Sequence, residues 1–218
     1  MKILVFSDSH LTEKVDRRIN ILENLLGQVD QVIINGDFWE GYLITFDRFV
    51  NSPWRRLFPL LKKKKTVYIY GNHDKKLLAD NRVGLFSEKQ TISYKLRLNG
   101  KMLIFEHGNR IVPAIDDLLR LKKLPKLIQY PVRTFHDFMI KKHGRKFINF
   151  VFRRFGVELK KRLGKVLQKN QVYVCGHTHY AEVDIENGLV NSGIFRSGLA
   201  QYLILENSKI SLNEQLYQ

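Results

Sequence analysis

One pattern constrains the fold of this chain more than any other, and it occurs five times: a short apolar run leads directly into a cluster of Asp, Asn or His. The runs are Ile3–Phe6, Val32–Ile34, Thr66–Tyr70, Met102–Phe105 and Val172–Cys175. Nearly continuous apolar runs of this length are typical of strands buried on both faces. Because ligands of open α/β sheets gather beyond the carboxyl ends of strands, we expect the five polar clusters to converge on one site.

The segments between these runs predict an α/β fold of two packed mixed sheets with helices outside. Helical periodicity separates the early strands, over Lys14–Leu26 and again over Trp54–Leu61. The later segments alternate and are separated by turn residues, which is the pattern of hairpins. The predicted hairpins pair Thr91–Leu98 with Lys101–Phe105, Glu182–Ile185 with Leu189–Asn191, and Gln201–Leu205 with Lys209–Leu212.

The polar clusters offer seven candidate metal ligands: Asp8, His10, Asp37, Asn72, His107, His177 and His179. A mixture of imidazole and oxygen donors suits Mn²⁺, Fe²⁺ or Zn²⁺ better than Ca²⁺. Seven ligands are too many for one catalytic ion that must keep open positions, but they suffice for two ions that share a bridging carboxylate.

The positive charge of the chain is concentrated in one segment. The whole chain has 37 Lys and Arg against 21 Asp and Glu, a net charge of +16, and residues 110–170 account for 17 of these cations and 4 of the anions. Helical patterns over Pro113–Leu124, Pro131–His143 and Lys146–Leu167 predict that this segment is a basic helical insertion within a single domain of residues 1–218. An anionic partner would explain the charge: a phosphorylated substrate, a nucleic acid or a membrane surface. A solvated lysine-rich surface is the alternative.

Other features indicate where the protein works. No apolar run approaches the roughly 18 residues of a membrane-spanning helix, and the apolar stretch before Asp8 is too short for a signal peptide. The single cysteine, Cys175, excludes an internal disulfide and fits a reducing compartment. We therefore expect a cytoplasmic protein, with the basic segment as a candidate for contact with the inner face of the membrane.

The ordered motifs resemble those of the calcineurin-like metallophosphoesterases. They are Asp8-x-His10, Gly36-Asp37, Gly71-Asn72-His73-Asp74, His107-Gly108 and Gly176-His177-Thr178-His179. The resemblance covers most of the chain outside the insertion and implies a four-layer α/β/β/α sandwich. It also implies two ligand sets that share Asp37 as the bridge. The first metal would take Asp8, His10, Asp37 and His179, and the second Asp37, Asn72, His107 and His177.

This family also implies a mechanism for phosphoester hydrolysis. A hydroxide that bridges the two metals would be the nucleophile, because metal binding lowers the pKa of water. His73 would act as the general acid that protonates the leaving group, and Asp74 would orient it or stabilise its charge. The expected cofactors are two divalent ions, with Mn²⁺ preferred and Fe, Zn, Ni, Co or Mg as alternatives.

Within the family, three features are similar to the UDP-2,3-diacylglucosamine hydrolases: the segment Gly36–Glu40, the pair His107-Gly108, and a helical insertion before His177. That subgroup has Arg where this chain has His73, and His73 instead matches general phosphatases and phosphodiesterases. The resemblance implies a phosphodiester or pyrophosphate substrate, with a UDP-diacylglucosamine-like lipid as a candidate.

The insertion is expected to form a cap, at residues 110–170, that chooses the substrate. Basic residues interleaved with aromatic ones can bind an anionic, partly apolar molecule, a membrane surface or a nucleic acid. The candidate substrate-binding residues are Asn109, Arg110, Arg153 and Arg154. A nuclease or nucleic-acid-directed phosphodiesterase is one alternative function. A non-catalytic interaction module is another, which the loss of metal ligands would favour, and here none of the seven is missing.

Overall fold

The computed structural model describes residues 1–113 and 126–217 and contains two mixed β-sheets. The first sheet has seven strands in the order β10-β11-β1-β2-β3-β4, with β12 paired to β11. Strands β1 to β4 run parallel, whereas β10, β1 and β12 each pair antiparallel to β11. The strands are β1 Ile3–Phe6, β2 Gln31–Asn35, β3 Val67–Ile69, β4 Lys89–Thr91, β10 Phe195–Arg196, β11 Leu199–Glu206 and β12 Lys209–Leu216.

The second sheet has five strands in the order β5-β6-β7-β9-β8. Its central strands β6, β7 and β9 are parallel, and β5 and β8 pair antiparallel at the two edges. The strands are β5 Tyr94–Leu98, β6 Lys101–Phe105, β7 Gln171–Cys175, β8 Glu182–Asp184 and β9 Leu189–Asn191.

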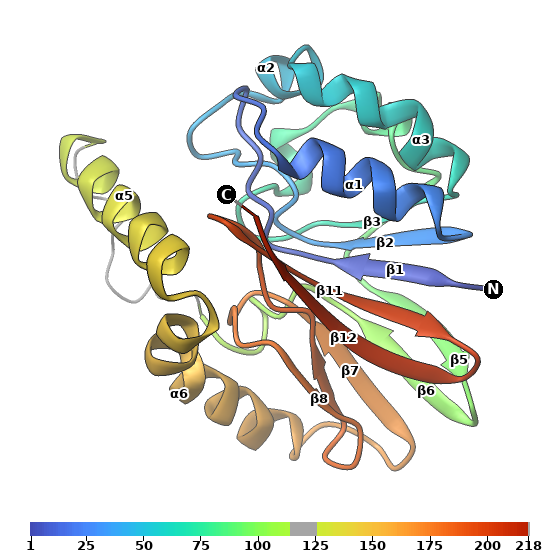
Figure 1. The fold of residues 1–218 in the computed structure, drawn as a ribbon. Helices are drawn as coiled ribbons and strands as arrows, with labels where there is room; N and C mark the ends of the chain where they lie inside the picture. Colours follow the sequence, from blue (N-terminus) through green and yellow to red (C-terminus); the bar gives the residue numbers. More distant parts are fainter. Residues whose placement is uncertain (114–125, 218) are drawn as a thin grey trace.

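The two sheets pack face to face, and helices cover their outer faces (Figure 1). Val5 and Ile33 of the first sheet share an apolar cluster with Phe105 and Val174 of the second. On the far side of the first sheet lie α1 (Arg18–Gly27), α2 (Phe46–Val50), the 3₁₀ helix η1 (Pro53–Leu57) and α3 (Phe58–Lys63). The far side of the second sheet is covered by α6 (Arg145–Leu163). The predicted four layers, helix, sheet, sheet and helix, are thus present.

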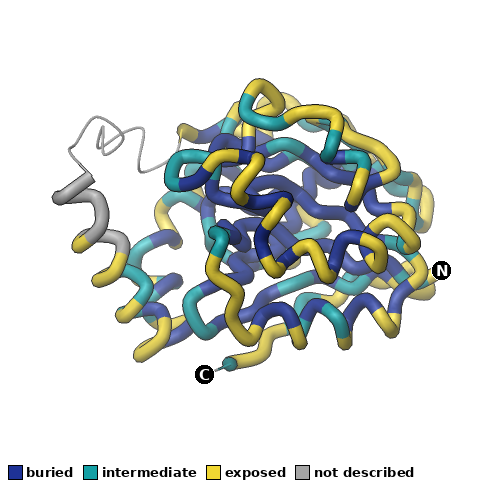
Figure 2. Tube along the Cα trace, turned by 90° about the horizontal axis from the view of Figure 1, so that it is seen from above, coloured by how far each residue is buried: buried dark blue, intermediate teal, exposed yellow. Residues whose placement is uncertain are grey.

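Buried residues are concentrated in the strands at the centre of the molecule (Figure 2). The apolar runs that suggested strands are buried along their whole length in β1 and in β3, as expected for a strand covered on both faces. Two short 3₁₀ helices, η2 (Lys76–Leu78) and η3 (Asn81–Leu85), complete the connection from β3 to β4.

Three predicted elements differ from the observed ones. The predicted strand Thr91–Leu98 is two strands, β4 and β5, which belong to different sheets; the chain bends at Ser93, whose N–H is bonded to Thr91 Oγ1. The helix predicted over Trp54–Leu61 is divided into η1 and α3, because Pro59 has no N–H for a continuous α-helical ladder.

The first predicted helix begins later than expected, at Arg18 instead of Lys14. The Asp16 carboxylate accepts a hydrogen bond from the Arg18 N–H at 3.0 Å, and this interaction satisfies a backbone donor at the start of α1.

The insertion contributes two long helices to the described part of the chain. Helix α5 (Lys126–His143) includes the predicted helix Pro131–His143 and has Pro131 in its interior, and α6 ends at Leu163, four residues before the predicted end. Gly144, with a φ of 53°, joins the two helices. The predicted helix Pro113–Leu124 lies almost entirely outside the described residues.

Figure 1 shows α5 standing away from the sheets, whereas α6 lies along them. No helix in the described part of the chain combines the length and the apolar character needed to cross a membrane.

Helix α6 is held on the second sheet by Leu159, which is fully buried against Tyr173 and Leu189. We expect Leu159→Ala to reduce the free energy of unfolding by about 2–5 kcal/mol, because it leaves a cavity between the helix and the sheet. The exposed Val157 on the same helix is the matched control, and Val157→Ala should change the free energy by less than about 0.5 kcal/mol. Urea denaturation monitored by circular dichroism measures both, and equal effects would contradict this packing.

Candidate metal centre

The two sheets bring their polar loops to a common edge. The loop after β1 is bonded to the loop after β2, through Asp8 N to the Gly36 carbonyl (3.1 Å) and His10 N to the Asp37 carbonyl (2.9 Å). Across the sheets, Asn35 Nδ2 at the end of β2 donates to the Val174 carbonyl in β7 at 2.9 Å. These bonds place the loops of both sheets around one buried volume.

The backbone in this volume is strained in an unusual way. Five of the seven predicted ligands have positive φ values between 44° and 61°: Asp8, His10, Asp37, His177 and His179. This left-handed conformation costs a non-glycine residue roughly 1–3 kcal/mol, and such costs cluster at functional sites, where the surrounding structure enforces them. Four of these five side chains, those of Asp8, His10, Asp37 and His179, belong to compact groups of potential ligand atoms.

Two glycines of the motifs leave room for the carboxylates. A Cβ at Gly71 would lie 2.2 Å from Oδ1 of Asp37, and a Cβ at Gly176 would lie 2.2 Å from Oδ2 of Asp8. No side chain fits at either distance. The glycines of Gly-Asn-His-Asp and Gly-His-Thr-His therefore serve the close approach of the backbone to Asp37 and Asp8.

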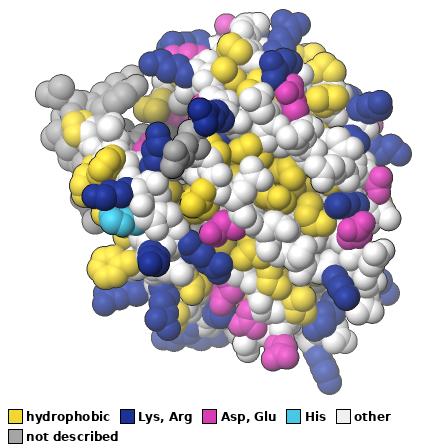
Figure 3. Space-filling model, in the orientation of Figure 1, with side chains coloured by type: hydrophobic (Ala, Val, Ile, Leu, Met, Phe, Trp, Pro, Cys, Tyr) yellow, Lys and Arg dark blue, Asp and Glu magenta, His cyan; other side chains and the backbone are white. Residues whose placement is uncertain are grey.

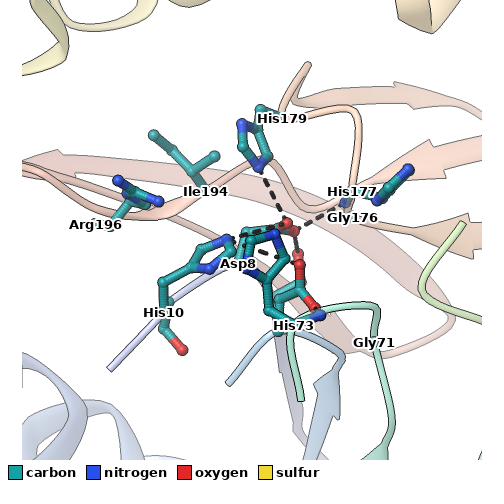
Figure 4. Close-up of polar contacts among 12 residues, drawn as sticks. Asp8, His10, Gly71, His73, Gly176, His177, His179, Ile194 and Arg196 are labelled. Carbon is teal, nitrogen blue, oxygen red and sulfur yellow. Dashed lines mark hydrogen bonds and ion pairs between the residues drawn. The ribbon is translucent and has the colours of Figure 1, made fainter. Parts of the chain in front are cut away.

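The first group of ligand atoms surrounds Asp8 (Figure 4). Oδ2 of Asp8 accepts hydrogen bonds from the backbone N–H of His177 at 2.9 Å and from Ser7 Oγ at 2.5 Å. Oδ1 lies 3.2 Å from Nε2 of His179 and 3.9 Å from Nε2 of His10. One oxygen is thus anchored to the protein, and the other faces two imidazole nitrogens.

The second group of ligand atoms is built around Asp37. Its Oδ1 accepts a hydrogen bond from the backbone N–H of His73 at 2.8 Å. Its Oδ2 lies 3.1 Å from Nε2 of His107 and 3.8 Å from Nε2 of His10, and Asn72 Oδ1 lies 3.2 Å from the same nitrogen of His107. A single oxygen of Asp37 therefore faces histidines from both predicted ligand sets, as a bridging ligand must.

His177 is placed differently from the other predicted ligands. Its Nε2 donates to the Val112 carbonyl at 2.9 Å, which leaves Nδ1 as the nitrogen with a free lone pair. Its ring centre lies 5.0 Å from that of His107. Within the described residues His177 is in none of the compact groups of ligand atoms, so its ligand role remains a prediction, through Nδ1.

Buried polar atoms without partners show that these residues fit a metal. Asp8 Oδ1 and His10 Nε2 are buried, and neither has a hydrogen-bond partner among the described residues. Leaving such atoms unpaired costs about 1–3 kcal/mol each. Oxygen and nitrogen atoms bound to one cation at 2.0–2.2 Å lie about 3 Å apart, close to the 3.2 Å between Asp8 and His179. The donor set therefore suits a divalent cation of the Mn, Fe or Zn kind.

A buried carboxylate, Glu40, holds two of the histidines in place. Its Oε2 lies 3.0 Å from Nδ1 of His10, and its Oε1 lies 2.7 Å from Nδ1 of His73. Each ring therefore turns its Nε2 away from Glu40. We assigned Glu40 no role from the sequence. Its position three residues after Asp37, next to the apolar Phe38 and Trp39, could have indicated a buried acid close to the site.

Asp74 does not have the role predicted for it. Its Oδ1 accepts hydrogen bonds from the backbone N–H groups of Gly71 and Asp37. Its Oδ2 accepts one from the backbone N–H of Phe38 and one from the Tyr68 hydroxyl. All four are 2.6–3.1 Å long. Asp74 is fully buried and organises the two loops that carry Asp37 and His73. The group that orients His73 is Glu40, because Asp74 points into the backbone and not toward the histidine.

Asn191, which follows β9, supports the last loop. Its Nδ2 donates to the Gly176 carbonyl and to Thr178 Oγ1, both at 2.8 Å. These bonds fix the turn between His177 and His179.

Burial and charge set the protonation of the histidines. Burial lowers the pKa of His10 to about 4, and it lowers that of His177 to about 3, so both rings are neutral at neutral pH. Burial acts in the same direction on His107, but the carboxylates of Asp37 and Asp8 outweigh it and raise its pKa to about 10. For Asp8 and Asp37 the neighbouring histidines outweigh burial and hold the carboxyl pKa well below its usual range.

The predicted substrate-binding residues are separated by the fold. Asn109 and Arg110 line a pocket that also includes His107. Arg153 and Arg154 are exposed on α6, and their side chains are not on the face of the helix that reaches the site. That face presents Phe152, whose ring centre lies 4.9 Å from the ring centre of His179. The contact between α6 and the site is therefore aromatic, and substrate binding by Arg153 and Arg154 stays a prediction.

Comparisons with known proteins agree with this architecture. A model of the calcineurin-like phosphoesterase superfamily domain matches residues 1–200. No curated protein matches the sequence significantly. The phosphoesterase Yfce from E. coli is 17% identical, with 97% of this chain and 91% of that chain covered and a TM-score of 0.50. Zinc-bound Vps29 from Entamoeba histolytica is 12% identical, with 99% of each chain covered and the same TM-score. At these identities the two structures are similar to this chain in fold.

The carboxylates of Asp37 and Asp8 raise the pKa of His107 to about 10, and a histidine must be neutral to bind a metal, so binding at His107 would release a proton. We expect uptake of Mn²⁺ at pH 7 to release about one proton, and the affinity for Mn²⁺ to rise with pH up to the His107 pKa of about 10. Calorimetric titration in buffers of different ionisation enthalpy measures the release. His143→Gln, at an exposed histidine of the cap, is the control and should preserve it. The same binding enthalpy in every buffer would show that His107 carries no proton.

Proposed function

The chain belongs to the calcineurin-like phosphoesterase superfamily and is a metal-dependent phosphoesterase, and on that premise we propose that it hydrolyses a phosphodiester or pyrophosphate bond. The observation that carries the proposal is the buried convergence of Asp8, His10 and Asp37, where Asp8 Oδ1 and His10 Nε2 have no hydrogen-bond partner in the described structure. Unpaired donor atoms of this chemistry in one volume are what a cation site requires.

We propose two cations that would share Asp37 as a ligand. Asp8, His10, Asp37 and His179 would hold the first, and Asp37, Asn72, His107 and His177 the second. When bound, the cations would activate water and polarise the phosphoryl oxygens. Mn²⁺ is the proposed ion. The neutral rings of His10 and His177 contribute affinity without cancelling the positive field that a phosphate needs.

His73 is proposed as the general acid. Its Nδ1 lies 2.7 Å from Glu40 Oε1, and this contact fixes the orientation of the ring. The Nε2–H then points away from Glu40 and can donate a proton to the leaving-group oxygen. The same carboxylate holds His10, so Glu40 couples the position of the acid to the position of a metal ligand. Asp74 maintains the backbone of both loops and transfers no proton.

We propose that residues 110–170 form a cap that receives the remainder of the substrate. Figure 3 shows hydrophobic and basic side chains interleaved on the cap helices. The side chains of Phe135, Phe138 and Phe150 are more than half exposed, and Phe135 and Phe138 line an open groove of about 570 Å³ on α5. Exposed aromatic residues among cations suit an anionic molecule with an apolar part, such as a UDP-diacylglucosamine-like lipid. Contact of this surface with an anionic membrane belongs to the same proposal.

The same cap residues support a second candidate, a nucleic-acid-directed phosphodiesterase. Aromatic side chains among lysines and arginines can stack on bases and neutralise phosphates. One screen separates the candidates: Mn²⁺-loaded protein with p-nitrophenyl phosphate, bis(p-nitrophenyl) phosphate, nucleotides, UDP-diacylglucosamine and single-stranded DNA. Activity on DNA that falls steeply with salt would favour the nuclease.

If Asp37 bridges two cations, its removal should cost both activity and metal. We expect Asp37→Ala to reduce hydrolysis of bis(p-nitrophenyl) phosphate by roughly 10³-fold or more and to bind at least one ion fewer in elemental analysis. Asp30→Ala, at a largely exposed position, is the control and should keep both. A fully active Asp37→Ala protein with two ions would refute the proposed site.

If His73 is the general acid, its importance should follow the leaving group. An alkoxide needs a proton, whereas p-nitrophenolate needs little help, so His73→Ala should lose about 10²-fold more rate on an alkyl ester than on a nitrophenyl ester. Glu40→Gln keeps the shape but removes the charge; because Glu40 also holds His10, it should lower the rate on both esters, and more on the alkyl ester. Equal losses on both esters would mean that His73 stabilises charge without transferring a proton.

A further inference from the structure

A small pocket adjoins the candidate metal centre. It has a volume of about 170 Å³ and lies between the loop that follows β3 and the loop that follows β6. Gly71 and His107 belong both to its wall and to the loops that carry predicted metal ligands, so the pocket adjoins those loops. The lining residues are Tyr70, Gly71, Lys75, Lys76, Ile92, Glu106, His107, Gly108, Asn109 and Arg110.

Among the described residues, the charged side chains that line this pocket are mostly positive. Lys75, Lys76 and Arg110 are exposed, and no carboxylate within residues 1–113 and 126–217 lies within ion-pair distance of any of the three. The one acid in the wall, Glu106, accepts a hydrogen bond from Tyr173 Oη at 3.2 Å. Three cations against one carboxylate create a local field that attracts an anion.

The size of the pocket narrows the class of anion. Sites for complete small molecules usually have volumes of about 300–1,000 Å³, so 170 Å³ accommodates one compact group and not a nucleoside or a sugar with its substituents. Lysine and arginine side chains are the usual partners of a phosphate group, and three of them line this pocket.

We propose that this pocket binds a second phosphate group of the substrate, the one that does not react. The proposal rests on the proposed phosphoesterase function and deepens it, because it assigns Lys75, Lys76 and Arg110 to substrate choice. A phosphodiester with a single phosphorus would leave the pocket without an anion. A substrate with two phosphates would gain the additional contacts.

A second phosphate has two sources, and the substrates distinguish them. In UDP-glucose and ADP-ribose it is linked directly to the reacting phosphate, and these molecules share little beyond the diphosphate. In the 5′-phosphorylated dinucleotide pTpT it lies one nucleoside away from the reacting diester, and TpT lacks it. Bis(p-nitrophenyl) phosphate has one phosphorus and is the reference substrate.

The test compares two variants that each remove two positive charges. Lys75→Gln/Lys76→Gln alters the pocket. Lys63→Gln/Lys209→Gln is the matched control, with both lysines exposed at the end of α3 and the start of β12. For each protein loaded with Mn²⁺, kcat/KM is measured on the five substrates and expressed relative to bis(p-nitrophenyl) phosphate.

We expect the relative kcat/KM of the pocket variant to fall roughly tenfold or more, through an increase in KM. If the second phosphate is linked directly to the reacting one, the loss should occur on both UDP-glucose and ADP-ribose. If it lies one nucleoside away, the loss should occur on pTpT but not on TpT. The control should retain the ratios of the intact protein. Unchanged ratios in the pocket variant, or equal losses in the two variants, would overturn the second-phosphate subsite.

Failure of the proposed function gives a different result. If the intact protein hydrolyses none of the five substrates, the proposed action on phosphodiesters and pyrophosphates fails, and the pocket is then tested by calorimetric titration with UDP-glucose and pTpT. Binding by the intact protein that weakens tenfold in the pocket variant alone would still support the subsite. Equal affinity of the intact protein and the two variants would overturn it.

Discussion

The architecture of this protein depends on keeping two carboxylates, Asp8 and Asp37, ionised and almost fully buried in one small volume. Isolated buried charges are strongly unfavourable, so each must be paired or bound to a cation. The fold responds by anchoring one oxygen of each carboxylate to backbone N–H groups, from His177 and His73 respectively. The remaining oxygens face imidazole nitrogens. Each carboxylate therefore has one oxygen fixed by the backbone and one oxygen directed at the candidate metal site.

This arrangement has costs that the rest of the structure offsets. Left-handed backbone at Asp8, Asp37 and three other predicted ligands is tolerated because the loops are bonded to one another and to the strand ends. Carboxylates outside the predicted ligand set complete the framework: Glu40 holds two histidine rings, and Asp74 organises the loops after β2 and β3. The rigid sheets beneath them pack through an apolar layer, which keeps the loops in register.

The site is approached from two chemically different sides. Toward the cap lies Phe152, against His179, and beyond it are the exposed aromatic residues of α5 and α6. Toward the loop after β3 lies the small pocket with Lys75, Lys76 and Arg110. An apolar side and a cationic side at one centre match the amphipathic phosphoester that we propose as the substrate.

The sequence by itself determined the strands that carry the site and the residues that converge there. Short buried strands and the residues directly after them are local features, and parallel strands bring their ends together whatever the side chains do. Only the tertiary structure decided which acid orients His73, since the sequence indicated its neighbour Asp74, whereas Glu40, distant in the chain, contacts the ring. It also divided Thr91–Leu98 between two sheets and turned Phe152, instead of Arg153 or Arg154, toward the site. These outcomes depend on contacts between segments distant in the chain, which local patterns of hydrophobicity do not encode.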